Sequence, residues 1–160
     1  MQTIHVRSLA PGDVGFVQGQ LLRTFHSLVI WSREVEFKAD ALPGFIGEVE
    51  GVPRGHLTLH HGADETEVIT LVSEHENAGL GAALLQRAVE LARERSSSRV
   101  FLTTTNDNLR ALGFYQRRGW RLVALHRGLM DLYRERERSL PTHAANGIPI
   151  HDELELELRL

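Results

Sequence analysis

The segment from Glu67 to Trp120 constrains the fold more than any other part of the chain. It predicts a strand, a glycine turn, a helix, a second strand and a second helix, in that order. The turn spans Glu76 to Gly81, and a helix with an apolar stripe follows from Leu80 to Arg95. The first turn of a helix presents unpaired backbone N–H groups and the positive end of the helix dipole. This junction therefore predicts a phosphate-binding site.

Hydrophobic periodicity predicts the other elements. Besides the helix after the glycine turn, a helix is expected to about His26, after the turn and cap Pro11-Gly12-Asp13, with Val14, Val17, Leu21 and Leu22 on one side. Another is expected from Asn108 to about Arg118, and Gly119 suits its C-terminal stop. The segment from Leu28 to Ala41 is ambiguous. Strands that alternate with helices early and pair locally late imply a mixed α/β sheet. The predicted strands are Thr3–Ser8, Phe45–Glu50 and His56–His61 (a hairpin around Gly51-Val52-Pro53), Glu67–Ser73, Val100–Thr104, Trp120–Leu125 and Glu153–Leu160, the last with leucines on one face and glutamates on the other.

Composition excludes several classes of function. The chain has 160 residues, 42% of them hydrophobic and 24% charged, which is ordinary for one globular domain, and no internal repeat or linker divides it. A net charge of −3 argues against nucleic acid as a partner. The absence of cysteine excludes disulfides, thiolate metal sites and a cysteine acyl-enzyme. No apolar run resembles a signal peptide or a membrane span of about 20 residues, so a cytoplasmic location is predicted.

The nine histidines do not predict a metal site. His60 and His61 are adjacent on a predicted strand, so their side chains point to opposite faces. His56 and His60 share a face but lie about 13 Å apart along it, which is too far for one ion. We therefore expect no metal.

A second motif lies downstream of the glycine turn, with Asn108, Ala111, Phe114-Tyr115 and Gly119-Trp120. Alone, Gly79-Leu80-Gly81 also suits an ordinary strand-to-helix turn. Together the two motifs resemble the GNAT superfamily of acetyl-CoA-dependent N-acetyltransferases. Its first motif is Gln/Arg-x-x-Gly-x-Gly/Ala, and its second is close to Asn-x-x-Ala-x-x-Phe/Leu-Tyr-x-x-x-Gly-Phe. The runs from Thr103 to Ala111 and from Gly147 to Ile150 look like those of a subgroup of uncharacterised bacterial members.

The resemblance implies an α/β fold of the GNAT type. Such a fold has a mixed, mostly antiparallel central sheet of about seven strands flanked by about four helices. The order of predicted elements fits it over nearly the whole chain, so residues 1–160 are expected to form a single N-acetyltransferase domain.

The resemblance also implies that acetyl-CoA is the acetyl donor. Its pantetheine arm would pair with the strand end at Leu71-Val72, and its pyrophosphate would rest on backbone amides of the glycine turn, where a Cβ would hold the phosphate away. Glu76 departs from the family pattern, since a carboxylate repels pyrophosphate, and its side chain is not assigned as a ligand. The implied cofactor-binding residues are Leu71, Val72, Asn77, Ala78, Gly79, Leu80, Gly81, Ala82, Asn108 and Ala111. Asn108 equally suits a helix cap, and one side chain can do both.

Tyr115 is the residue that the resemblance assigns to catalysis. When an amine attacks the thioester, the departing thiolate needs a proton or a hydrogen-bond donor. A phenol with a reference pKa of about 10 stays protonated at neutral pH and can supply either. The alternative is a half-buried aromatic residue that packs against the sheet, although its neighbour Phe114 suits that role better.

Glu67 is the candidate general base. A lysine-like amine has a pKa of about 10.4, so only about 10⁻³ of it is neutral at pH 7 and a proton acceptor would help. Glu67 matches the position of a glutamate base in some family members and is expected to share a face with Ile69 and Leu71. A solvated charge at a strand end is an equally good interpretation. A backbone N–H near Val72 would meet the oxyanion.

The sequence therefore predicts acetyl transfer to an amine by direct attack in a ternary complex. The acceptor is unidentified, and the region from about Phe25 to Leu42 is expected to shape its site. Two other classes remain open: an acyl-CoA sensor without turnover, and an interaction protein that dimerises through the C-terminal alternating strand. Sheet edges near the C-terminus are also compatible with a homodimer of the enzyme.

Overall fold

The computed structural model describes residues 1–74 and 78–160. The described chain divides into two compact units. The first unit contains Met1–Ile30, Phe37–Val100 and Leu160, and the second contains Trp31–Glu36 and Phe101–Arg159. Each unit is described by itself below.

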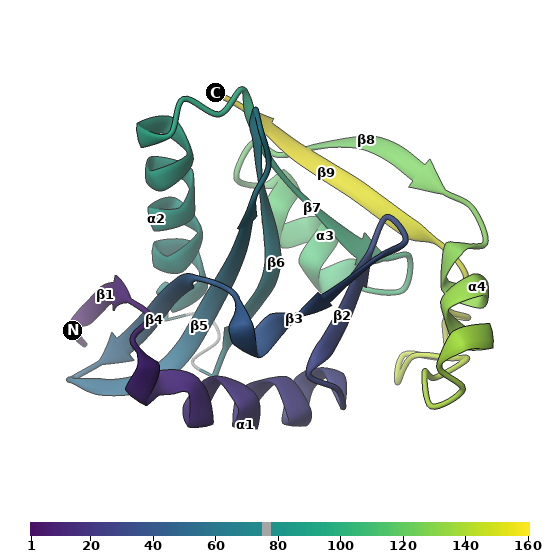
Figure 1. Cartoon of the computed structure of the whole chain (residues 1–160), viewed down its shortest axis with the longest axis horizontal. Helices are drawn as coiled ribbons and strands as arrows, with labels where there is room; N and C mark the ends of the chain where they lie inside the picture. The colour runs from purple at the N-terminus through teal and green to yellow at the C-terminus, as the bar shows by residue number, and fades with distance from the viewer. Residues whose placement is uncertain (75–77) are drawn as a thin grey trace. The chain divides into compact units, whose positions relative to one another are not determined.

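The first unit contains four antiparallel strands in the order β1-β4-β5-β6 (Figure 1). Strands β4 and β5 form the predicted hairpin. The turn consists of Glu50 and Gly51, so it begins one residue earlier than expected. These two residues have the positive φ angles, 51° and 77°, that a tight hairpin turn needs. The strands are β1 Ile4–Ser8, β4 Gly44–Val49, β5 Val52–His61 and β6 Glu65–Ser73.

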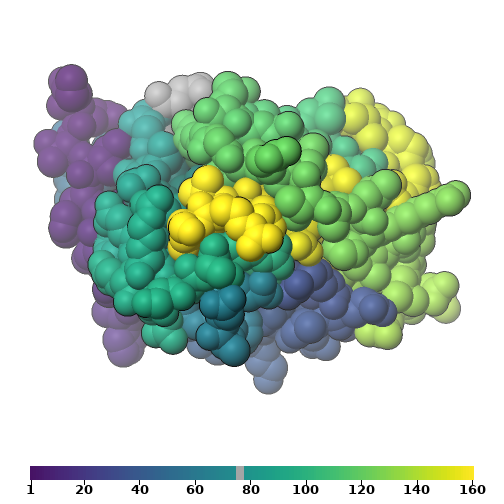
Figure 2. Space-filling model, turned by 90° about the horizontal axis from the view of Figure 1, so that it is seen from above, coloured from purple at the N-terminus to yellow at the C-terminus, as the bar shows by residue number. Residues whose placement is uncertain are grey.

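Two helices cover opposite faces of these strands. Helix α2 (Leu80–Glu94) packs Leu80 close to Gly55 of β5, and a Cβ at Gly55 would lie 3.2 Å from Leu80 Cδ2. Helix α1 (Val14–Phe25) bonds to His56, the next residue of β5. Because neighbouring residues of a strand point to opposite faces, the two helices lie on opposite sides. Figure 2 shows α2 in teal beside the purple N-terminal strand.

Helix α1 departs from its predicted packing in two respects. Leu22, expected on the apolar side, is 50% exposed, whereas Gln20 is buried with Leu21. Asp13, expected to cap the helix, instead bonds to Arg7 and to the backbone N–H of Ala10 at the short 3₁₀ turn η1 (Pro11–Asp13).

The second unit contains strands in the order β7-β9-β8, with β8 (Arg121–His126) antiparallel to β9 (Glu153–Arg159). Strand β7 (Arg99–Thr105) begins in the first unit and continues into the second. Figure 2 shows the yellow surface of the C-terminal strand beside green residues of the second unit. Helices α3 (Leu109–Gln116) and α4 (Leu129–Arg136) complete this unit, and α4 was not predicted.

The alternation predicted for β9 is present, but its charged face is the more buried one. Glu153 is only 2% exposed, and Glu155 and Glu157 are buried as well, whereas Leu160 is partly exposed. This strand therefore brings carboxylates inside the second unit.

The ambiguous segment forms a small hairpin of β2 (Val29–Ser32) and β3 (Val35–Lys38), followed by the 3₁₀ turn η2 (Ala39–Ala41). Its turn residues Arg33 and Glu34 have φ angles of 48° and 67°. Together the seven strands and four α-helices give the mostly antiparallel α/β fold that the sequence predicts. Among the described residues, no helix combines the length and apolar character needed to cross a membrane.

Candidate functional site

Strand β6 contains a β-bulge in the middle of its pairing with β5. Thr70 lies opposite Thr58, but the next pair is Val68 with Leu59, so Ile69 is an extra residue on β6. A bulge reverses the alternation of side chains beyond it. The side chains of β6 therefore alternate between the two faces in one phase up to Val68 and in the opposite phase from Thr70 onward.

The bulge overturns the expectation that Glu67 shares a face with Leu71. Glu67 lies opposite His60, and Leu71 lies opposite Leu57. His60 and Leu57 are three residues apart on β5, so they point to opposite faces, and their partners follow them. Glu67 is therefore on the face of His56 and Thr70, which is the side of α1. Its carboxylate is 3% exposed, so it is not a solvated charge at the strand end.

The glycine turn ends where α2 begins. Gly79 is the N-cap of α2 with φ of 84°, a conformation that favours glycine. Among the described residues, the one atom within 4 Å of a Cβ built at Gly79 is Ile4 Cδ1, at 3.7 Å, which is an ordinary contact. The positive φ angle therefore favours glycine at this position. Within residues 1–74 and 78–160, no side chain caps α2, and the first turn of the helix has no acidic residue.

The first turn of α2 has the chemistry of an anion site. The hydrogen bond from Ala83 N–H to the Gly79 carbonyl is the first in the helix. The amides before it, on Leu80, Gly81 and Ala82, have no acceptor inside the helix. These groups and the helix dipole suit the pyrophosphate of CoA. Ala78 is exposed beside them, whereas Asn77 and Glu76 lie outside the described residues.

Packing fixes the place of this helix start in the first unit. Leu80 is fully buried against β4 and β5, where two glycines stand. A Cβ at Gly47 would lie 2.5 Å from Leu80 Cδ1, and one at Gly55 would lie 2.7 Å from the Val72 carbonyl oxygen. The two glycines therefore let Leu80 of α2 lie close to β4 and β5, and Gly55 also leaves room for the Val72 carbonyl at the end of β6.

Asn108 is the N-cap of α3 in the second unit. Its Oδ1 accepts a hydrogen bond from the Ala111 backbone N–H at 3.2 Å, and its Nδ2 lies 3.4 Å from Thr104 Oγ1. The predicted capping role is confirmed. Ala111 is half-buried in the first turn of α3.

Tyr115 is the buried aromatic residue of α3, with an exposed fraction of 8%. It packs on Trp120 with a ring separation of 5.5 Å and against Phe114 at 5.2 Å. Phe114, expected to be the core residue, is instead half-buried beneath the guanidinium of Arg118. Burial raises the pKa of the Tyr115 phenol above its ordinary value, so it stays protonated at any physiological pH.

Sequence reasoning missed a set of buried polar side chains on the α1 side of β5 and β6. His56 Nδ1 lies 2.7 Å from Gln20 Oε1, and His56 Nε2 lies 3.0 Å from Thr70 Oγ1, which also bonds to Thr58. Burial lowers the pKa of His56 to about 4, so it is neutral at pH 7. The available signal was Gln20 itself, an amide in the apolar stripe of α1 between Val17 and Leu21.

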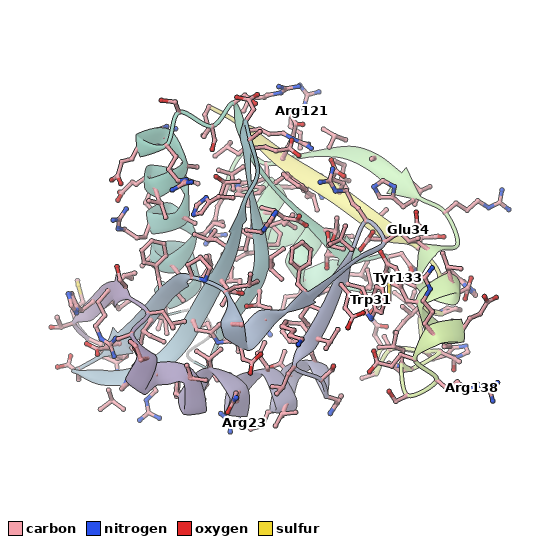
Figure 3. The ribbon with its side chains drawn as sticks, viewed as in Figure 1. Arg23, Trp31, Glu34, Arg121, Tyr133 and Arg138 are labelled. Carbon is pink, nitrogen blue, oxygen red and sulfur yellow. The ribbon has the colours of Figure 1, made fainter. Side chains whose placement is uncertain are left out.

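The second unit contains the turn of the β2–β3 hairpin, within the region expected to shape the acceptor site. Glu34 donates its backbone N–H to the Tyr133 hydroxyl at 2.8 Å, and Arg33 donates its own to Glu153 at 3.1 Å. Trp31 stacks on Tyr133 with ring centroids 5.4 Å apart. Figure 3 shows Trp31, Glu34 and Tyr133 gathered at this end of the hairpin. Burial raises the pKa of Glu153 above the ordinary range of a carboxyl.

Within the described part of the chain, no group of three or more His, Cys, Asp or Glu side chains is arranged to hold a metal ion.

Comparisons with known proteins agree on one family. The family model described as "Acetyltransferase (GNAT) family" matches residues 17–120. The uncharacterised protein YxbD of Bacillus subtilis (strain 168) is 45% identical over 100 residues, which are 62% of this chain and 63% of YxbD. The chain therefore spans less than two thirds of YxbD. The uncharacterised protein YdhI of the same organism is 39% identical over 119 residues, which are 74% of each chain.

Solved structures share the fold. An IAA acetyltransferase from Bacillus cereus ATCC 14579 superposes with a TM-score of 0.76 at 19% identity, covering 99% of this chain and 100% of that one. An acetyltransferase from Bacillus subtilis in complex with CoA gives a TM-score of 0.73 at 18% identity, covering 100% and 99%. At such identities the likeness shows the fold alone.

Proposed function

Because the chain belongs to the acetyltransferase (GNAT) family, we propose that it transfers an acetyl group from acetyl-CoA to an amine by direct attack in a ternary complex. The observation that carries this proposal is the start of α2, where amides without helical acceptors follow Gly79. A similar solved structure is a complex with CoA, which supports the same ligand here. The whole chain would then act as one acetyltransferase domain.

The donor would be held by the end of β6 and the first turn of α2. The amides of Leu80, Gly81 and Ala82 would bind the pyrophosphate, with Ala78 and Asn77 in the preceding turn. Leu71 and Val72 would pair with the pantetheine arm. In the second unit, one N–H of Asn108 Nδ2 would donate to the arm while the other bonds to Thr104 and Oδ1 caps α3, and the small side chain of Ala111 would leave room for the arm.

Acetyl-CoA supplies an activated acetyl group as a thioester. The amine nitrogen attacks the carbonyl carbon, a C–N bond forms, and the C–S bond then breaks to release the CoA thiolate. The amine loses one proton and the thiolate gains one, so the reaction is balanced without a further co-reactant. The residues of this chain have to accept the first proton and stabilise the departing sulfur.

We assign stabilisation of the sulfur to the Tyr115 hydroxyl. A thiol has a reference pKa of about 8.5 and a phenol about 10, and burial raises the pKa of Tyr115 further. Full proton transfer from Tyr115 to the thiolate is therefore uphill. A hydrogen bond from a phenol that stays protonated does not have this cost, so we propose that Tyr115 acts as a hydrogen-bond donor to the developing thiolate.

We assign the proton acceptor to Glu67. The bulge places its carboxylate on the α1 side of β6, opposite His60, whose ring lies 5.1 Å from that of Phe37 in the region expected to shape the acceptor site. As a carboxylate, Glu67 can accept the proton that the amine loses when it attacks the thioester. The direct role and a role through one water molecule give the same pH dependence.

The alternative is an acyl-CoA sensor that binds the cofactor without turnover. It would use the same start of α2, but it needs neither a buried carboxylate on β6 nor a phenol on α3. The presence of Glu67 and Tyr115 in those places favours the enzyme.

Calorimetric titration with CoA tests the cofactor site. We expect micromolar binding by the wild type, and loss of binding in Gly81→Glu, whose carboxylate would enter the phosphate site. Gly12→Glu is the matched control, because it adds the same charge where nothing lies within 4 Å of a Cβ. A wild type that does not bind CoA would remove the proposal.

Turnover is then measured as free thiol released with a panel of amines. Tyr115→Phe should lower kcat by about 10²-fold and leave CoA affinity unchanged. A wild type that binds CoA but acetylates no amine, and behaves like Tyr115→Phe, would favour the sensor.

The homodimer and the cytoplasmic location stay predictions. Strand β8 is the last strand in the sheet order, and its apolar residues Leu122, Val123 and Leu125 are exposed, the last to 60%. These apolar side chains support a sheet-edge dimer. Light scattering on the wild type and on Leu125→Lys tests it, since the charge should convert a dimer into a monomer.

A further inference from the structure

The first unit buries a line of polar side chains that the proposed reaction does not use. It runs from Thr58 and Thr70, beside the bulge, through His56 to Gln20 on α1. Gln20 Nε2 continues the line with two bonds at 3.2 Å, to the Arg54 carbonyl and to Glu74 Oε1. The line therefore spans the part of β6 between the bulge and the glycine turn.

Each hydrogen bond in this line has only one consistent direction. The Arg54 carbonyl and the Glu74 carboxylate can only accept, so the amide nitrogen of Gln20 faces them and its oxygen faces His56. His56 must then carry its proton on Nδ1, which leaves Nε2 as an acceptor for the Thr70 hydroxyl. A flipped Gln20 amide would set its oxygen against two acceptors, the Arg54 carbonyl and the Glu74 carboxylate.

Gln20 ties helix α1 to the residue that follows β6. Glu74 comes directly after the last residue of β6 and five residues before Gly79. Its backbone N–H also bonds to the Arg54 carbonyl at 2.9 Å. Arg23 contacts the same carboxylate at 3.2 Å, but its side chain is 65% exposed (Figure 3), so that ion pair contributes little. Gln20 is 1% exposed and provides the buried connection.

We propose that Gln20 is a positioning residue for cofactor binding, with the orientation of its amide fixed by the Arg54 carbonyl and the Glu74 carboxylate. It holds the end of β6 through Glu74 and so directs the chain into the turn that binds the pyrophosphate. The inference rests on the proposed function, since it concerns the same cofactor site. It assigns no direct contact with CoA to Gln20 or His56.

The test compares two isosteric substitutions on α1. Gln20→Glu keeps the acceptor for His56 but sets a carboxylate against Glu74. Gln18→Glu makes the same change two residues earlier, where Gln18 Nε2 donates to Asp40 at 3.0 Å, away from β6. We expect the Kd for CoA, measured by calorimetry, to rise at least about tenfold in Gln20→Glu and less than about twofold in Gln18→Glu.

A double variant separates positioning from the burial of a charge. Gln20→Glu with Glu74→Gln exchanges donor and acceptor within this pair, so the amide of residue 74 can donate to the carboxylate of residue 20 and the net charge returns to that of the wild type. Of the two bonds that Gln20 Nε2 donates, only the one to the Arg54 carbonyl is then not restored. We expect its Kd for CoA to fall to within about threefold of the wild type. Melting temperatures measured alongside show whether each variant is folded.

The outcomes distinguish a failure of the proposed function from a failure of the positioning role of Gln20 alone. If the wild type does not bind CoA, the proposed function fails. If it binds CoA and Gln20→Glu and Gln18→Glu are equally affected, the positioning role of Gln20 is overturned while the function stands. If Gln20→Glu does not fold, the double variant decides, and a folded double variant that binds CoA more than about tenfold more weakly than the wild type overturns the role.

Discussion

The hydroxyl oxygen of Tyr133 accepts a hydrogen bond from the backbone N–H of Glu34 at 2.8 Å, and its proton points to the carboxylate of Glu153 at 3.3 Å. Glu153 in turn accepts from the backbone N–H of Arg33. The two turn residues of the β2–β3 hairpin are thus held by one phenol and one buried carboxylate in the second unit. Because this turn lies in the predicted acceptor region, its order bears on the acceptor of the proposed reaction.

Tyr133→Phe should loosen this turn without removing its aromatic packing. The ring can keep its stack on Trp31, but the Glu34 amide loses its acceptor and Glu153 loses a donor. Leaving such groups unpaired costs about 1–3 kcal/mol of unfolding free energy. We also expect faster hydrogen exchange of the Glu34 amide. Unchanged exchange in the folded variant would show that the phenol does not hold the turn.

His56 should make stability depend on pH between its two pKa values. Burial lowers its pKa from 6.5 to about 4 in the folded state, so between these values the unfolded chain binds more protons. The contribution of His56 to the free energy of unfolding is therefore fully present above pH 6.5 and is lost as the pH falls toward 4. A shift of this size is worth about 3 kcal/mol.

Urea unfolding at pH 4.5 and pH 7 measures the effect. His56→Gln has no titrating group there, so its loss of stability on acidification should be smaller than that of the wild type. Carboxylates with lowered pKa values, such as Asp13 and Glu48, contribute equally to both proteins. Equal pH dependence in the two proteins would show that His56 titrates normally in the folded state.

Local patterns predicted most of the elements and part of the site. The turn from Glu76 to Gly81 and the cap at Asn108 depend on residues close in sequence, and α2 and α3 begin where these signals stand. Gly119, with φ of 87°, follows the end of α3 as expected. Alternation likewise predicted β9, because a two-residue period needs no knowledge of the partner strand.

What the sequence did not predict depends on pairing between distant segments. The extra residue Ile69 exists only relative to β5, so the face of Glu67 cannot be derived from β6 alone. Gln20 meets two polar groups of β5 and the carboxylate of Glu74, which follows β6, and none of these partners can be read from the pattern of the helix. The hairpin turn uses Arg33 and Glu34 at positive φ, where glycine or asparagine would have signalled it.

Gly55 should be sensitive to the addition of one methyl group. A Cβ there would lie 2.7 Å from the Val72 carbonyl oxygen, which belongs to the backbone and has little room to move. Gly55→Ala should therefore displace the end of β6, lower the unfolding free energy by about 1–3 kcal/mol and weaken CoA binding.

Gly15→Ala is the matched control for that substitution. Gly15 lies in α1 with nothing within 4 Å of a Cβ, so alanine should raise the unfolding free energy by about 0.5–1 kcal/mol. Thermal unfolding of both variants and calorimetry with CoA provide the comparison. A Gly55→Ala protein that binds CoA like the wild type would show that β6 tolerates the shift.

Asn106 connects the two sequence runs that resemble the bacterial subgroup. Its Oδ1 accepts from the backbone N–H groups of His151 and Asp152, each at 3.0 Å, and its Nδ2 donates to the Pro149 carbonyl at 2.9 Å. Asn106 belongs to the run before α3, and Pro149 belongs to the Gly147–Ile150 run. A single amide in the second unit thus holds the start of the segment that leads to Tyr115.

Asn106→Ala removes all three hydrogen bonds, whereas Asn106→Asp keeps both acceptor contacts and loses only the donor to Pro149. At about 1 kcal/mol for each bond, the alanine variant should lose about 2–4 kcal/mol of unfolding free energy, and the aspartate variant about 1–2 kcal/mol. Urea unfolding of the two variants under identical buffer conditions measures the difference. Equal losses would mean that the donor bond to Pro149 alone holds the two runs together, because both variants lack it and only the aspartate variant retains the other contacts.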